Sequence, residues 1–160
     1  MTTPSAAPAA DGPTTAAGYS TSFTVEQPPE EVYAAILDVP AWWTGQIDGP
    51  TAEVGSEFTY RHPPQHYSRQ RVVALEPARR VVWRVTDSDL PFVSEPAEWT
   101  GSEIVFEIGA TAGGTVLRFT HVGLVPDVEC YGACSIGWQH YVGNSLRRLI
   151  TTGEGAPDPW

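Results

Sequence analysis

The fold of this chain is constrained most by its last long segment, residues 127–152, which has the periodicity of an amphipathic helix. Positions on one face of this helix are Tyr131, Cys134, Trp138, Tyr141, Val142, Ser145 and Leu149. Glycines at 132, 137 and 143 weaken the helix by about 1 kcal/mol each relative to alanine. They also permit close packing, so we predict that this helix lies on a sheet.

Several runs with strand character come before this helix. We expect strands at residues 56–62, 66–75, 80–86, 102–108 and 115–122. Turn signals separate some of them, at Pro63-Pro64, Glu76-Pro77 and Gly113-Gly114. Consecutive strands joined by short connections predict an antiparallel meander. Residues 87–99 are expected to form a longer loop.

The N-terminal part adds a strand and two short helices. Residues 20–26 alternate as a strand does, and Pro28 opens a helix whose first turn is acidic. We expect Pro40 to stop this helix after Asp38, and residues 41–44 to form a second short helix. Residues 1–18 have the composition of a disordered tail. Residues 19–153 are therefore predicted to be one domain, followed by a Gly/Pro-rich tail at 154–160.

Charge excludes several functions. The chain has 160 residues, a net charge of -10, nine arginines and no lysine. It lacks the basic surface that nucleic acids or anionic membranes require, and it has no lysine for Schiff-base chemistry or a phosphate loop. We find neither a membrane-spanning run nor a signal peptide, and expect a cytoplasmic protein with no cofactor and no metal.

Two segments resemble a known superfamily. One runs from Ser22 to Ile36 and is followed by Trp42-Trp43; the other, Arg118 to Pro126, leads into the C-terminal helix. Together they resemble the SRPBCC (START-like, helix-grip) superfamily, in the branch related to the activator of the ninety-kilodalton heat-shock chaperone. The resemblance implies an α+β fold, in which a curved antiparallel sheet grips the long C-terminal helix, with two short helices after the first strand.

In such a fold, the concave face of the sheet and the inner face of the last helix enclose an apolar cavity. Strand alternation gives the inward sets Phe58, Tyr60 and His62; Ile104, Phe106 and Ile108; Leu117, Phe119 and His121; and Val81, Trp83 and Val85. The predicted ligand-binding residues are Trp42, Trp43, Phe58, Tyr60, Trp83, Phe106, Phe119, His121, Cys134, Trp138 and Tyr141.

Three of these residues are candidates for catalysis. His121 ends an inward series and could transfer a proton at the end of the cavity, or it could be bonded to backbone at a strand end. Tyr60 and Tyr141 could orient a ligand oxygen, or their hydroxyls could bond to backbone or water.

Other polar groups have simpler explanations. Cys130 and Cys134 could bind zinc, form a redox disulfide or supply a nucleophile, but buried thiols are the expected outcome. Arg69 or Arg71 could hold a carboxylate, although a solvated outer face is expected. The acidic residues between 87 and 98 are expected to be solvated.

Three functions remain open. The first is a binding protein for a small apolar or aromatic molecule. The second is an enzyme. The resemblance implies this possibility, because relatives with this fold include polyketide cyclases and dehydratases. The third is a co-chaperone-like interaction domain; known activators carry a separate chaperone-binding domain before this one, where we expect only the short tail. A second copy of the chain is a further possible partner, in a homodimer.

Overall fold

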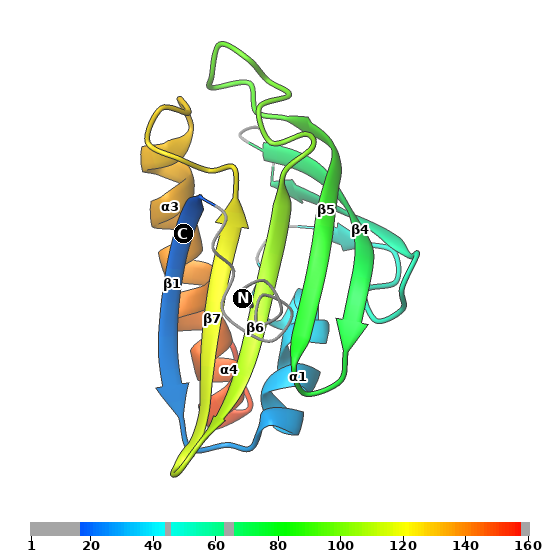
Figure 1. The fold of residues 1–160 in the computed structure, drawn as a ribbon. Helices are drawn as coiled ribbons and strands as arrows, with labels where there is room; N and C mark the ends of the chain where they lie inside the picture. Colours follow the sequence, from blue (N-terminus) through cyan, green and yellow to red (C-terminus); the bar gives the residue numbers. More distant parts are fainter. Residues whose placement is uncertain (1–16, 44–45, 63–65, 158–160) are drawn as a thin grey trace, which may run out of the picture.

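A computed structural model describes residues 17–43, 46–62 and 66–157, and contains one seven-stranded antiparallel sheet. The strands are β1 (Gly18–Val25), β2 (Gln46–Asp48), β3 (Glu57–His62), β4 (His66–Glu76), β5 (Arg80–Asp89), β6 (Glu103–Thr111) and β7 (Gly114–Val122). Their order is β1-β7-β6-β5-β4-β3-β2, so β1 closes the sheet beside β7 and the rest follow as a meander (Figure 1). The predicted α+β helix-grip fold is confirmed.

The helices lie on one side of this sheet. They are α1 (Pro29–Leu37), α2 (Val39–Trp42), and a continuous C-terminal helix made of α3 (Tyr131–His140), the π-helical segment η2 (Tyr141–Leu146) and α4 (Arg147–Thr152). Figure 1 shows α3 and α4 running along β1 and β7, with α1 near the same end as α4. The helical layer and the sheet together enclose the core.

Some predicted boundaries were wrong. The second helix begins at Val39 rather than 41, because Pro40 occupies its first turn, where a missing N–H is tolerated. The C-terminal helix begins at Tyr131 rather than 127. β2 was missed, since three residues carry too little alternation to be recognised. Thr44 and the predicted turn at Pro63-Pro64 lie outside the described residues.

The π-helical segment changes which side of the last helix is buried. A π-helix closes its hydrogen bonds over five residues, so the buried face advances beyond the one that the 3.6-residue period predicts. Leu146 and Ile150 are buried as a result, while Leu149 remains only half-buried. Val142 and Ser145 are fully buried, as predicted.

The predicted inward sets lie in the core, except for His62, which is half-buried and lines a cavity. Phe58, Trp83, Phe106 and Phe119 are each at most 1% exposed. Their rings meet in edge-to-face contacts, with centroids 5.0 Å apart for Trp83–Phe106 and 5.2 Å apart for Phe106–Phe119. Aromatic pairs at these distances and angles contribute beyond the area that they bury.

Ser145 joins three segments that are distant in sequence. Its hydroxyl donates to the Trp42 carbonyl at 2.8 Å and accepts the Ala156 N–H at 2.9 Å. A ring nitrogen of His140 lies 3.2 Å from the Pro157 carbonyl. Residues 154–157 therefore pack back on the C-terminal helix and on the end of α2.

We expect Ser145→Ala to lower the free energy of unfolding by about 1–3 kcal/mol, because a buried carbonyl and a backbone N–H both lose this partner. Urea unfolding monitored by tryptophan fluorescence measures the change. Thr151→Ala is the matched control: its hydroxyl is exposed and bonds only within the helix, so its effect should stay within about 0.5 kcal/mol. Equal stability of the Ser145 variant and the native chain would contradict the bridging role.

Candidate functional site

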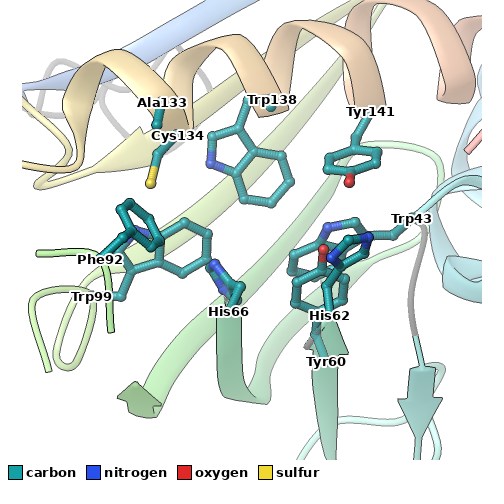
Figure 2. A pocket seen from close by; sticks show the side chains of 11 residues that line it. Trp43, Tyr60, His62, His66, Phe92, Trp99, Ala133, Cys134, Trp138 and Tyr141 are labelled. Atoms are coloured by element: carbon teal, nitrogen blue, oxygen red, sulfur yellow. The ribbon is translucent and has the colours of Figure 1, made fainter. Parts of the chain in front are cut away.

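A cavity of about 280 Å³ lies between the sheet and the C-terminal helix, at the end where α3 begins. Its lining residues are Trp43, Tyr60, His62, His66, Phe92, Trp99, Ala133, Cys134, Gly137, Trp138 and Tyr141. In Figure 2, side chains of α3 and η2 face those of the sheet across the cavity, and Phe92 and Trp99 close one end. This cavity is the candidate ligand site.

Aromatic rings form most of the cavity wall. Trp43 stacks on Tyr60 with a centroid distance of 4.2 Å and an interplanar angle of 13°. Trp99 and Trp138 are also nearly parallel, 5.8 Å apart at 15°. Trp43 contacts Trp138 at 5.1 Å, which links the two pairs. A wall of this kind presents flat apolar faces to a ligand.

The structure brings only part of the predicted ligand set to this wall. Trp43, Tyr60, Cys134, Trp138 and Tyr141 line the cavity. The remaining predicted residues, Trp42, Phe58, Trp83, Phe106, Phe119 and His121, are buried in the packed core instead. Large rings fill the other end of the concave face, and the cavity is left only where they stop.

Four lining residues were not anticipated as ligand contacts on the sheet and loop side: His62, His66, Phe92 and Trp99. Alternation places His62 inward, and the pairing of His62 with His66 across the two strands puts His66 on the same face. Phe92 and Trp99 belong to the loop after β5, where no periodicity shows which side chains turn inward. Their aromatic character was the only available signal.

His121 is a structural residue beneath the cavity wall. Trp138 donates its indole N–H to His121 Nδ1 at 3.1 Å, so the ring carries its proton on Nε2. Nε2 lies 2.9 Å from the Ser102 hydroxyl, which donates in turn to the Trp99 carbonyl. Both ring nitrogens are engaged, which leaves His121 no free position for proton transfer to a ligand.

Burial lowers the pKa of His121 to about 3, with a smaller contribution from His66. A histidine that accepts a hydrogen bond on Nδ1 must stay unprotonated there, which agrees with the direction of the pKa shift. The neutral ring connects Trp138 on α3 with the segment that carries Trp99. His121 therefore fixes the position of α3 relative to the loop that carries Trp99, and both segments line the cavity.

His66 lines the cavity together with His62. It makes edge-to-face contacts with Tyr60 at 4.9 Å and with Trp99 at 4.3 Å. Burial lowers its pKa to about 3, and His62 adds to the effect. The imidazole is therefore neutral at pH 7. Its Nε2 lies 3.3 Å from the Ser68 hydroxyl.

Acidic side chains attach the loop after β5 to the start of α3. The Glu98 carboxylate accepts the N–H groups of Glu129 and Cys130 at 3.0 and 2.9 Å. The Glu129 carboxylate accepts the N–H of Ser94 at 3.0 Å. These bonds satisfy backbone donors just ahead of a helix, where negative charge is favoured. Glu98, expected to be solvated, instead holds the loop that closes the cavity.

Cys130 and Cys134 are joined in a disulfide, which corrects the expectation of free thiols. The Cα atoms are 5.6 Å apart, a separation that a disulfide can span. Cys130 precedes α3, so the bridge crosses the start of the helix rather than two turns inside it.

The arginines of β4 face outward as expected, since Ser68 and Gln70 take the inward positions. Within the described residues, no group of three or more His, Cys, Asp or Glu side chains could hold a metal ion. None of the helices in the same ranges is long and apolar enough to cross a membrane.

Comparison with known proteins supports the fold. The sequence profile of the family described as "Activator of Hsp90 ATPase homolog 1-like protein" matches residues 26–151. A search of curated proteins by sequence finds no significant match.

Solved structures similar to the fold include the Aha1 dimer from Colwellia psychrerythraea, which is 25% identical with a TM-score of 0.70, covering 87% of this chain and 99% of that one. DynU16, described as a putative protein in the dynemicin biosynthetic locus, is 21% identical with a TM-score of 0.63, covering 85% of this chain and 48% of its own. CalU16 from Micromonospora echinospora is 16% identical with a TM-score of 0.59, covering 83% and 74%.

The two neutral histidines predict a loss of stability in acid. In the unfolded chain, His66 and His121 have the ordinary pKa near 6.5, whereas in the folded chain their pKa is about 3. Between pH 6.5 and pH 3 the unfolded state therefore binds more protons than the folded state, and the free energy of unfolding decreases as the pH falls. Each histidine should remove about 2 kcal/mol between pH 7 and pH 5. His121→Gln should roughly halve that loss, as measured by urea unfolding at both pH values.

Ser102→Ala is the control for this experiment, because it breaks a bond to His121 and keeps the imidazole. It should lower stability at pH 7 and leave the difference between the two pH values unchanged. A His121→Gln chain that loses as much stability in acid as the native chain would show that His121 already binds a proton when folded.

Proposed function

This chain belongs to the family of Activator of Hsp90 ATPase homolog 1-like proteins, and we propose that it is a binding protein for a small apolar or aromatic molecule. One observation carries the proposal: a cavity of about 280 Å³, walled by aromatic rings, at the end of an otherwise filled core. Closely packed interiors contain few voids of this size, and concave apolar sites with a few polar groups are typical of ligand pockets.

The wall is held in place before any ligand arrives. Trp138, His121, Ser102 and Trp99 form one hydrogen-bonded chain that fixes the Trp138 ring and the backbone of Trp99. Glu98 then holds the loop that carries Trp99 against the start of α3. A preformed site loses less conformational entropy on binding, which favours affinity for a rigid apolar ligand.

An enzyme similar to cyclases or dehydratases is the second candidate. The observation that favours it is the presence of Tyr60, His66 and Tyr141, all with polar tips, around one apolar cavity. Such a site could fold a substrate and place one or two polar groups against it. Chromatography of a bound molecule after incubation distinguishes the two, since only an enzyme converts it to product.

A protein-interaction role is the third candidate, favoured by the family match itself. Because the similar Colwellia protein is described as a dimer, we also propose self-association of this chain. Light scattering during size-exclusion chromatography should give twice the mass of one chain at micromolar concentration. A single-chain mass across the concentration range would exclude the dimer. A pull-down from a lysate of the source cells that retains no chaperone would remove the interaction role.

Ligand binding is tested with N-phenyl-1-naphthylamine, an uncharged aromatic dye that fluoresces in apolar surroundings. We expect saturable binding by the native chain. Ala133→Trp should raise the dissociation constant at least about tenfold, because Ala133 is an exposed lining residue and a large ring there narrows the entrance of the cavity. Ile136→Trp introduces the same ring on the same helix at a position that is 57% exposed and outside the lining, so binding should be unchanged.

Equal affinity of the two tryptophan variants would place the dye elsewhere and contradict the proposal. Native mass spectrometry of the purified protein provides an independent measurement. A discrete extra mass that disappears on denaturation would identify the class of the natural ligand.

A further inference from the structure

A row of polar side chains runs along β4 on the otherwise apolar concave face. His66, Ser68 and Gln70 alternate inward on this strand, and Ser68 and Gln70 are completely buried. Buried polar groups are costly unless they are hydrogen-bonded. The row connects the interior of the sheet to the one histidine ring that both lines the cavity and contacts Ser68.

The hydrogen bond from Gln70 to Ser68 sets a direction that the contact between Ser68 and His66 can continue. Gln70 donates its amide Nε2–H to the Ser68 oxygen at 2.5 Å. With its oxygen accepting from Gln70, the Ser68 hydroxyl can donate to His66 Nε2, which lies 3.3 Å away, whereas Gln70 Oε1 has no partner among the described residues. Nε2 of His66 is then an acceptor, which puts the proton of the neutral ring on Nδ1.

The Nδ1–H group is left as an available donor beside the cavity. Within the described residues, no hydrogen bond engages His66 Nδ1, and the side chain is only partly buried. Figure 2 shows the ring rising from the sheet between Trp99 and Tyr60. Its edge contacts with both rings limit the directions that a ligand can approach from.

The electrostatics favour an uncharged ligand. The titratable groups facing His66 are Tyr60 and His62 from β3, His121 from β7 and Tyr141 from the C-terminal helix. Among the described residues, the lining includes no arginine, aspartate or glutamate. An anion would lack a counter-charge there, and so would a cation, which would also meet the positive end of an N–H group.

Resting on the proposed binding function, we propose that His66 is the specificity-determining residue of this cavity, donating its Nδ1–H to an uncharged acceptor, such as a carbonyl, on a flat aromatic ligand. Ser68 and Gln70 act as positioning residues that hold the required tautomer. The paired rings of Trp43 with Tyr60 and of Trp99 with Trp138 supply the flat apolar surfaces.

A matched pair of probes tests the proposal in the native protein. 9-Fluorenone and fluorene have the same planar three-ring frame, and only the ketone carries an acceptor. Titration by tryptophan quenching should show fluorenone binding about tenfold more tightly, the value of one hydrogen bond in an apolar site. Equal affinities, with N-phenyl-1-naphthylamine still bound, would overturn this inference and leave the proposed function intact. If fluorenone, fluorene and N-phenyl-1-naphthylamine all failed to bind, both this inference and the proposed binding function would be overturned.

Two phenylalanine substitutions separate the histidines of the cavity. His66→Phe keeps a ring against Tyr60 and Trp99 and removes the donor, so fluorenone should lose its tenfold advantage while fluorene binds as before. His62→Phe is the matched control, since His62 pairs with His66 across the strands and also lines the cavity. It should change the affinities for fluorenone and fluorene by the same factor, because it alters the wall and leaves the His66 donor in place. A preference that survives His66→Phe would assign the donor to another residue.

Nitrogen-15 spectra of the histidine rings measure the tautomer directly in the native chain, whether or not the variants fold. His66 should be protonated on Nδ1 and His121 on Nε2. Gln70→Met should shift His66 towards the Nε2 tautomer and reduce the fluorenone preference. A native His66 ring protonated on Nε2 would overturn the proposal, as would tighter binding of the cationic three-ring analogue N-methylacridinium than of fluorenone.

Discussion

The architecture of the cavity depends on one hydrogen-bonded chain from the buried Trp138 and His121 through Ser102 to the Trp99 carbonyl. It connects the C-terminal helix, the last strand and the loop after β5, three parts of the chain that meet only in the folded state. A neutral imidazole suits this position because it accepts on one nitrogen and donates on the other. Burial lowers its pKa, and the bond from Trp138 requires the same protonation state.

Packing decides where the cavity lies. Trp42, Trp83, Phe106 and Phe119 fill the concave face at one end, where aromatic contacts leave no room for a ligand. Towards the start of α3, the helix presents small residues at Ala133 and Gly137 instead. The core and the site are therefore two ends of one aromatic layer. They differ in the size of the side chains that the C-terminal helix places opposite the sheet.

Polar groups enter this layer in a restricted way. Ser68 and Gln70 are completely buried in an apolar face, yet they lead to a single histidine at the cavity. Their burial has a cost that apolar side chains on the same strand would avoid, and the contacts between Gln70 and Ser68 and between Ser68 and His66 reduce it. The acidic residues of the loop act differently, since Glu98 binds backbone N–H groups and leaves the interior uncharged.

The sequence by itself determined the fold class, the inward faces of the strands and the helix that covers them, because these follow from periods of two and 3.6 residues within single segments. It also indicated that Trp43, Tyr60, Trp138 and Tyr141 face the interior. Only the tertiary structure decided which interior residues reach open space. His121 was the first candidate for chemistry, and it is enclosed, whereas His66 and Trp99 line the cavity. The reason is physical: burial of a face is a local property of the chain, while a void is what remains after side chains from every element have been packed together.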